Sequence, residues 1–205
     1  MKKNTLILAL IALTALALGS CGHRNDYTPK PNAYIRFDLP DKAYSLYDTT
    51  ALPFLFERAD EADIVWQKDA RGEKWIDVIY PSYRGVMFIT YKPLHSEKDL
   101  PAQIDTSYEL LKQHFNFSSG VDEEQFYNPS RHVFATTYQL KGGDVASTYQ
   151  FWATDSTRHF LRGSLYLDCT PNNDSLAPII DYLQQDIVHL LETLQWRDRA
   201  NTAKQ

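Results

Sequence analysis

Cysteine is scarce in this 205-residue chain, which contains only Cys21 and Cys169. Cys21 is predicted below to be modified, so Cys169 alone remains and no intrachain disulfide can form. The fold must then be stabilised by side-chain packing. Thirteen tyrosines, ten phenylalanines and four tryptophans are sufficient for this, because aromatic side chains bury large apolar areas.

The usual sequence motifs of catalysis are also missing. The chain contains no H-E-x-x-H metalloprotease motif, no G-x-S-x-G nucleophile elbow, no phosphate-binding loop and no dinucleotide fingerprint. Its six histidines lack the spacing of metal ligands, and His189 is expected at the surface or the edge of the core. Cys169 alternates with leucines, which indicates a buried, unreactive thiol. We therefore expect no enzyme activity, no metal and no cofactor.

Basic residues are too few for a nucleic-acid-binding surface. Lys and Arg number 21 against 26 Asp and Glu, for a net charge of −5. The predicted export signal contains two lysines and no acidic residue, so the mature chain carries about −7. Since recognition of a phosphate backbone needs a basic face, a nucleic-acid partner is not expected.

No hydrophobic run reaches the roughly 20 residues of a membrane-spanning helix. The apolar run at 6–18 follows Lys2-Lys3 and is typical of a secretory signal. It ends in Leu18-Gly19-Ser20-Cys21, which has the lipobox pattern of an aliphatic residue and two small residues before a cysteine. We expect cleavage after residue 20 and lipid attachment at Cys21, with fatty acyl chains such as palmitate holding the chain on a membrane. An ordinary signal with a chance cysteine is the alternative.

Four segments follow from this interpretation. Residues 1–20 are the signal peptide, and 21–32 are a tether rich in polar residues with too little apolar surface to pack. Residues 33–197 are expected to form a single domain, and 198–205 a polar tail. Glycine at position 22 and the absence of an acidic cluster after it favour an outer-membrane location facing the periplasm.

Patterns of apolar residues predict the elements of an α+β fold. Alternation or short apolar runs indicate strands at 34–38, 53–56, 64–66, 74–80 and 86–91. Residues 81–85 read as the turn of a hairpin. Helical spacing then predicts a helix from Pro101 to Phe115. Three further strands are expected at 132–140, 145–154 and 159–169, and their short polar connections make them an antiparallel meander.

The last helix has the strongest pattern. Asp174 or Ser175 is expected to cap it, Pro178 lies in its first turn and Trp196 closes it. One stripe of aliphatic residues runs along it: Leu176, Ile179, Ile180, Leu183, Ile187, Leu190, Leu191 and Leu194. Burial of each such side chain contributes roughly 1.5–3 kcal/mol, so the sequence predicts that this helix covers the sheet.

The densest polar cluster lies between the last two predicted strands. Asp155, Arg158, His159 and Arg162 bring both charge signs to one short hairpin. One interpretation is an ordinary turn, in which Asp155 bonds to nearby backbone and both arginines are solvated. The other is an interaction edge, since each arginine offers forked donors to a carboxylate or phosphate. Strand alternation would turn His159 inward.

Several stretches resemble one family, in the right order and over nearly the whole mature chain. YQFWATDSTRHFLRGSLY at 149–166 is similar to the core motif of the gliding-motility lipoprotein GldD family, with conservative departures at Ala153 and Ser164. The other similar stretches are YIRFDLP at 34–40, YKPL at 91–94, PNNDSLAP at 171–178, DIVH at 186–189 and ETLQW at 192–196.

The resemblance implies an accessory cell-envelope lipoprotein of the gliding and type IX secretion machinery of Bacteroidota, with protein partners in the envelope. It supplies no catalytic residues. The element order is also similar to a PsbP-like α+β sandwich. Two alternatives remain open, both using the cleft between helix and sheet: a periplasmic module that binds a small ligand or a lipid, and a hydrolase.

Overall fold

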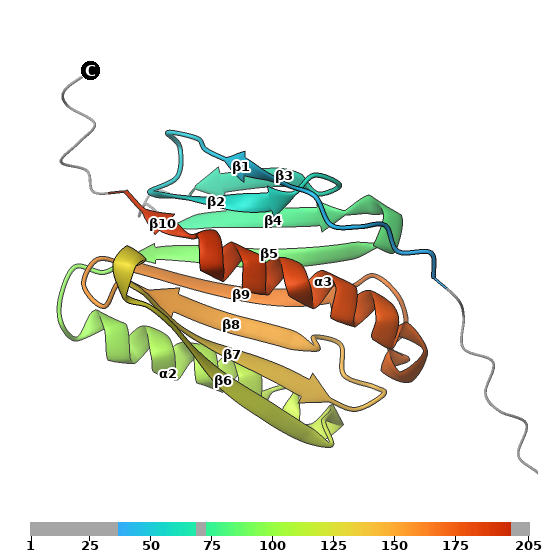
Figure 1. Ribbon diagram of the computed structural model, residues 1–205. Helices are drawn as coiled ribbons and strands as arrows, with labels where there is room; N and C mark the ends of the chain where they lie inside the picture. The colour runs from blue at the N-terminus through green and yellow to red at the C-terminus, as the bar shows by residue number, and fades with distance from the viewer. Residues whose placement is uncertain (1–36, 69–72, 198–205) are drawn as a thin grey trace, which may run out of the picture. The chain divides into compact units, whose positions relative to one another are not determined.

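A computed structural model describes residues 37–68 and 73–197 of the chain (Figure 1). The predicted signal peptide, Cys21, the tether at 21–32 and the tail at 198–205 lie outside these residues. Within the described part of the chain, no helix is both long enough and apolar enough to cross a membrane.

The central element is a seven-stranded sheet in which every neighbouring pair is antiparallel. Its spatial order is β3 (Asp63–Lys68), β4 (Lys74–Tyr80), β5 (Gly85–Pro93), β9 (His159–Leu167), β8 (Tyr149–Thr154), β7 (Val133–Lys141) and β6 (Gly120–Asn128). The hairpin of β4 and β5 and the meander of β7, β8 and β9 confirm the predicted pairings. The α+β class, with an antiparallel meander covered by helices, is likewise confirmed.

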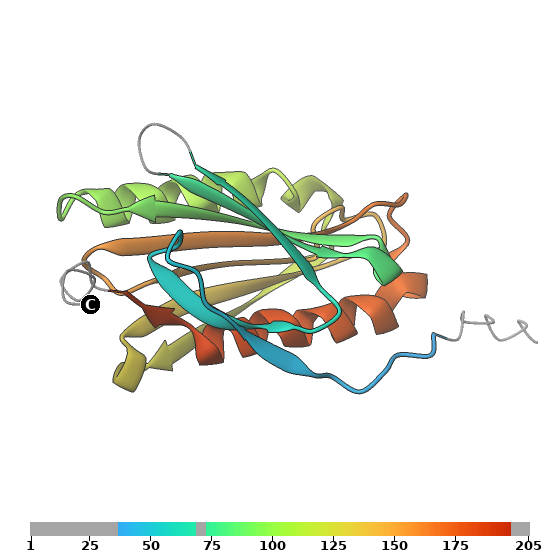
Figure 2. The ribbon, with the colours of Figure 1, turned by 90° about the horizontal axis from the view of Figure 1, so that it is seen from above.

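Opposite faces of this sheet carry different elements. Helix α3 (Asn173–Thr193) lies on one face and helix α2 (Asp99–Lys112) on the other (Figures 1 and 2). A smaller sheet of β1 (Tyr44–Tyr47), β2 (Phe54–Ala59) and β10 (Gln195–Trp196) lies beside α3. Contacts between α3 and β2 join the two, so the small sheet extends the cover on that face.

Two hairpins turn by the same device. The 3-10 helices η1 (Pro81–Tyr83) and η3 (Pro129–Arg131) each begin with proline, whose fixed φ suits a first turn. Each ends in a left-handed residue, Arg84 at φ 50° or His132 at φ 51°, whose N–H bonds back to the proline carbonyl. The predicted turn at 81–85 is thus a 3-10 turn that feeds directly into β5.

The main core lies between the seven-stranded sheet and α3. Strands β4 and β5 present their buried side chains to this face, among them Ile76, Val78, Met87 and Ile89, each at most 1% exposed. Seven of the eight residues in the predicted α3 stripe are buried, and Leu176 is partly buried. The prediction that this helix covers the sheet is therefore confirmed.

Gly163 of β9 shows how tightly this face is packed. The ring of Phe151 on β8 lies directly over it, and a Cβ at position 163 would stand 2.1 Å from the Phe151 Cε1 atom. Glycine is needed here because no side chain fits beneath the ring.

Several sequence predictions were wrong. Phe37 and Asp38 are not in a strand, and the rest of the strand predicted at 34–38 lies outside the described residues. Strand β6, which the apolar pattern missed, forms the far edge of the sheet. Neither Asp174 nor Ser175 caps α3, since Asn172 is the N-cap and makes no side-chain cap bond. Trp196 belongs to β10 rather than to the helix.

Candidate functional site

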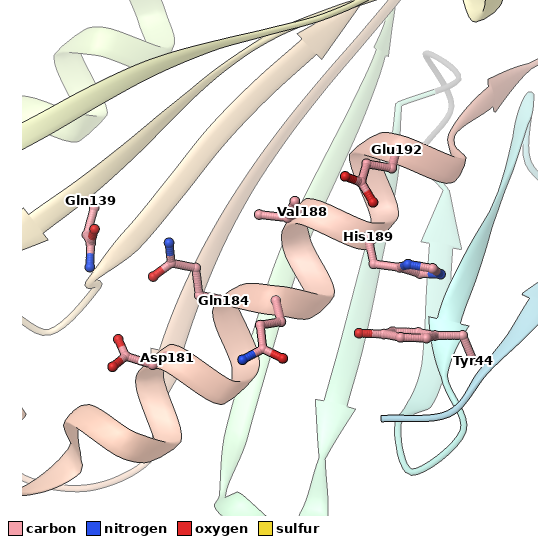
Figure 3. A pocket seen from close by; sticks show the side chains of 8 residues that line it. Tyr44, Gln139, Asp181, Gln184, Val188, His189 and Glu192 are labelled. Carbon is pink, nitrogen blue, oxygen red and sulfur yellow. The ribbon is translucent and has the colours of Figure 1, made fainter. Parts of the chain in front are cut away.

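A groove of about 490 Å³ runs along the outer side of α3 (Figure 3). It lies on the side of the helix opposite the apolar stripe, so the amphipathic pattern that buries one side makes the other polar. β1 and β7 contribute one residue each. The lining residues are Tyr44, Gln139, Asp181, Gln184, Gln185, Val188, His189 and Glu192. Two carboxylates and three amides dominate this lining, and no lysine or arginine is among its residues.

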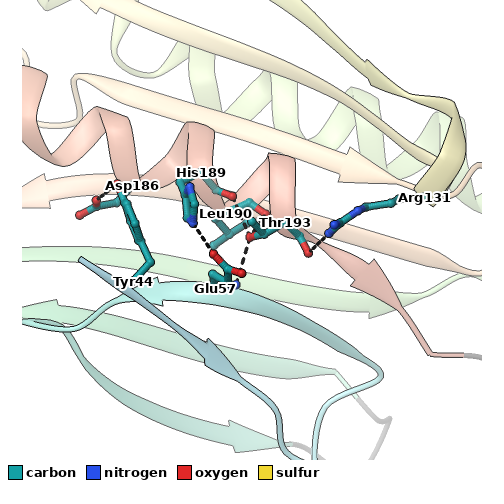
Figure 4. A network of polar contacts seen from close by, with 7 residues as sticks. All are labelled: Tyr44, Glu57, Arg131, Asp186, His189, Leu190 and Thr193. Atoms are coloured by element: carbon teal, nitrogen blue, oxygen red, sulfur yellow. Dashed lines mark hydrogen bonds and ion pairs between the residues drawn. The ribbon is translucent and has the colours of Figure 1, made fainter. Parts of the chain in front are cut away.

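His189 connects this groove to the small sheet. Its ring stacks on Tyr44, with centroids 3.6 Å apart, and its Nε2 lies 2.7 Å from Glu57 Oε2 on β2 (Figure 4). The backbone N–H of Glu57 donates to Thr193 Oγ1, whose hydroxyl donates to the His189 carbonyl. Arg131 donates to the Thr193 carbonyl from the turn before β7. The bond from Arg131 satisfies a carbonyl in the last turn of α3 that has no partner within the helix.

A buried carboxylate lies one turn earlier on α3. Asp186 is 3% exposed, and both of its oxygens lie 2.8 Å from Lys42 Nζ. Tyr44 donates to it at 3.0 Å, and Tyr80 also bonds to it. Burial raises the pKa of Asp186 above its usual range, although the Lys42 ammonium and the tyrosine hydroxyls oppose the shift. The ammonium also stands 3.3 Å from the centre of the Tyr182 ring.

These polar groups hold segments of the fold together. Lys42 attaches the segment before β1 to α3, and Glu57 attaches β2 to the same helix. Among residues 37–68 and 73–197, no group of three or more His, Cys, Asp or Glu side chains is placed to hold a metal ion. The groove lining offers amide, carboxylate, imidazole and phenol groups, which can form hydrogen bonds and charge pairs.

The structure separates the four residues of the predicted interaction edge. Asp155 caps the β8–β9 turn, where its Oδ1 accepts from the N–H groups of Thr157, Arg158 and His159 at 2.8–3.0 Å. Burial alone would raise the pKa of Asp155, but these backbone bonds outweigh it and leave the pKa below its usual range.

The other three residues point in different directions. Arg158 is exposed at the turn. His159 is 6% exposed, shares a 3.0 Å hydrogen bond with the Tyr91 hydroxyl and stacks on Trp196 at 5.1 Å, so it turns inward as alternation predicted. Arg162 is half-buried on the α2 face and donates to Gln150 Oε1 at 2.8 Å. Only Asp155 and Arg158 remain together at the tip.

The prediction for Cys169 was wrong. The residue is exposed, because β9 ends at Leu167 and the alternation that faces leucines to the core does not continue to position 169. His189, by contrast, lies at the edge of the core as predicted.

Sequence reasoning did not identify Lys42, Glu57 or Asp186. One signal was available, since Asp186 lies within the apolar stripe of α3, and an acid at such a position needs a buried partner. Its partner lies 144 positions away in the sequence, and nothing in the pattern around Lys42 points to it.

Comparisons with known proteins identify a family for this chain. Among solved structures, the chain is similar to the solution structure of cyanobacterial PsbP (CyanoP) from Synechocystis sp. PCC 6803. The identity is 10% and the TM-score 0.46, over 79% of this chain and 97% of that one, so the likeness concerns the fold alone. No curated protein shows significant sequence similarity. The family described as gliding motility lipoprotein GldD matches residues 24–196, and the chain belongs to this family.

Proposed function

We propose that the chain is a non-enzymatic accessory or assembly factor for gliding motility and type IX protein secretion. Membership of a gliding motility lipoprotein family supports the role in gliding motility. It also implies that a lipid anchor attaches the chain to the cell envelope. The lipobox supports Cys21 as the anchored residue, and glycine at position 22 supports an outer-membrane location facing the periplasm. In this proposal the partners are proteins of the envelope machinery.

The groove along α3 is the observation that carries this proposal. It is open, about 490 Å³ in volume, and lined by amides and carboxylates rather than by an enclosed apolar wall. His189 in its lining pairs with Glu57, and Asp186 on the same helix pairs with Lys42, so these two groups stabilise the fold. This supports a surface that binds a partner by charge and hydrogen bonding.

The charge of the groove indicates the kind of partner segment that it accepts. Asp181 and Glu192 are exposed, about three turns apart on the same helix. Complementary charge raises association rates and fixes register, so a segment with two spaced basic residues suits the groove. The β8–β9 turn, with Asp155 and Arg158, is a second candidate surface.

A deletion strain tests the proposed role. Loss of the gene should reduce export of type IX cargo, or surface spreading where the cell glides. Normal export together with normal spreading would refute the role.

Complementation of that strain then tests the groove. A variant with Asp181→Lys and Glu192→Lys should fold but restore export poorly. Glu109→Lys, which reverses an exposed acid on α2, is the control and should complement fully. Full complementation by a stable groove variant would remove the groove from the proposal and leave the role itself standing.

The anchor has its own test. Cys21→Ala should abolish incorporation of a clickable fatty acid and release the protein into the periplasm. Equal labelling of the variant and the parent would contradict lipid attachment at Cys21.

A small-ligand-binding role is the alternative that a specific observation favours. A second cavity, of about 200 Å³, lies between α2 and the sheet and contains a half-buried arginine.

A further inference from the structure

The second cavity lies on the face of the sheet opposite α3. Its floor consists of neighbouring positions on three strands, where Trp75 pairs with Thr90 and Thr90 pairs with Arg162. Helix α2 forms the roof through residues that include Ser107 and Leu110. About 200 Å³ is the volume of roughly seven water molecules, which fits a small ligand or the end group of a larger one.

Arg162 carries a charge here that the described part of the chain does not neutralise. Its guanidinium donates to Gln150 Oε1 at 2.8 Å, and no described carboxylate forms an ion pair with it. A half-buried cation that bonds only to a neutral amide has lost water without gaining a counterion. Burial accordingly lowers the pKa of Arg162. Four of its five N–H groups remain for other acceptors.

The surroundings of Arg162 show the effect of that charge. Burial lowers the pKa of His114, which follows the C-cap of α2, and the charge of Arg162 lowers it further. Gln150, whose oxygen is occupied by Arg162, has a buried amide nitrogen that makes no hydrogen bond to a described residue. Arg162 and its neighbour Gln150 therefore hold donor groups that lack acceptors among the described residues.

The other charges of the cavity cancel. Lys92 Nζ lies 3.5 Å from Glu73 Oε1, with side chains 31% and 24% exposed. Among the described residues, the net charge of the cavity lining is that of Arg162 alone. A singly charged ligand would neutralise this charge, while a doubly charged phosphate would leave one negative charge unpaired. The forked N–H groups of an arginine match the two oxygens of a carboxylate.

Apolar side chains complete the walls. Phe160 is buried in the floor, and Trp75 and Leu110 are 41% and 37% exposed at the cavity. They would pack against a hydrocarbon or aromatic group attached to the charged end.

We propose that the cavity between α2 and the sheet binds a small monocarboxylate with an apolar body, with Arg162 holding the carboxylate and Trp75, Leu110 and Phe160 holding the body. The carboxylate can belong to a free organic acid or to the C-terminus of a peptide. The site is separate from the α3 groove, so the proposal is independent of the role in motility and secretion.

Titration calorimetry on the lipidated chain in nonionic detergent tests the proposal. The probe is 3-phenylpropanoate, and 3-phenylpropanamide is the neutral control that also reports partition into detergent. The acid should bind at least tenfold more tightly than the amide and more tightly than inorganic phosphate. Equal affinities for acid and amide, or tighter binding of phosphate, would overturn the proposal.

Two substitutions should move the affinity in opposite directions. Arg162→Gln should weaken binding of the acid at least tenfold and leave binding of the amide unchanged. Glu73→Gln removes the carboxylate that pairs with Lys92, so the ammonium can attract the ligand, and binding of the acid should tighten several-fold. This second variant decides the matter if Arg162→Gln does not fold. Arg84→Gln, at an exposed arginine on the turn before β5, is the matched control and should change nothing. An unchanged affinity in both cavity variants would refute the assignment.

A final pair of probes distinguishes the two sources of the carboxylate. The tripeptide Ala-Ala-Phe with a free C-terminus is compared with its C-terminal amide. Binding of the free form at or above the affinity of 3-phenylpropanoate assigns the site to peptide termini. Weaker binding of the free form assigns the site to small organic acids.

Discussion

The two faces of the seven-stranded sheet are covered to different extents and by different kinds of side chain. On the α3 face, large apolar residues such as Ile76, Met87 and Leu161 are at most 1% exposed. On the α2 face, Trp75 is 41% and Phe88 is 44% exposed, and the closest contacts between α2 and the sheet are with β8 and β9.

This difference suggests that one face of the sheet stabilises the fold and that the other is available for binding. The α3 face excludes water and provides most of the apolar burial that drives folding. The α2 face holds the polar group of Arg162, Gln150 and Ser164, together with a cavity and exposed aromatic rings. Because the main core lies on the α3 face, polar and partly exposed groups on the α2 face cost the fold little stability.

The largest effect is expected from a charge placed in the α3 core. Leu183 is 0% exposed, and Leu183→Asp would bury an unpaired carboxylate while losing a large apolar contact. The free energy of unfolding should fall by more than about 5 kcal/mol. Thermal or denaturant melting measures this, with Gln185→Asp on the exposed side of the same helix as the control. A variant that melts within a degree or two of the parent would show that this side of the helix is not buried.

Breaking the ion pair on the same face should be the next most costly change. Lys42 is 12% exposed and Asp186 is 3% exposed. Lys42→Met would leave Asp186 buried without its cation, at a cost of about 3–5 kcal/mol at neutral pH. The exposed pair of Arg84 and Asp168 is the control, and Arg84→Met should have no measurable effect on melting.

The cost of Lys42→Met should depend on pH. Burial raises the pKa of Asp186 in the folded chain, and the substitution removes the main group that opposes this shift. The folded state then holds the proton more tightly than the unfolded state. The stabilising effect of protonation is fully present below the unfolded pKa of about 3.9 and is lost as pH rises through the folded pKa. The deficit of the variant should therefore shrink on acidification, and a deficit that grows would contradict the shift.

Adjacent residues of β5 allow a direct comparison of the two faces. Met87 faces α3 and is only 1% exposed, whereas Phe88 faces the other side of the sheet and is 44% exposed. Met87→Ser should cost about 2–4 kcal/mol, and Phe88→Ser no more than about 1 kcal/mol, although phenylalanine is the larger side chain. Urea unfolding of the two variants side by side decides this. Similar losses in both would mean that something covers the α2 face in solution.

The smallest effect on stability is expected at the tip of the β8–β9 hairpin. Arg158 is exposed, so Arg158→Glu should change the free energy of unfolding by about 0–1 kcal/mol. If the turn is an interaction edge, the stable variant should nevertheless restore a deletion strain only weakly. Complementation at full strength would leave Asp155 and its neighbours as an ordinary turn.

The sequence was most informative where apolar residues repeat with a fixed period. The stripe of α3 and the alternation in β4 each have one buried side, so burial and pattern agree. Strand β6 was missed because Asp122, Glu123 and Glu124 are exposed and interrupt any apolar alternation. Such charges on an edge strand prevent pairing with another chain, but they do not produce the pattern by which a strand is predicted.

The polar sites could not be predicted because their members are far apart in the sequence. Asp186 meets Lys42 only once α3 has packed beside β1, and Arg162 is enclosed only by α2. The four charged residues around the β8–β9 turn are predicted to form one cluster because they are close in the chain. Alternation along β9 instead sends His159 and Arg162 to opposite faces.

The strand order of the large sheet also has a consequence for the kinetics of folding. Strands β3, β4 and β5 are consecutive hairpins, and so are β6, β7, β8 and β9. The two groups meet only in the β5–β9 ladder, which runs from Gly85↔Leu167 to Pro93↔His159. Closing a long loop costs entropy before its contacts form, so each group can assemble early from local pairings. Formation of the β5–β9 ladder is then the slow event, and until it forms each group exposes an unpaired strand edge.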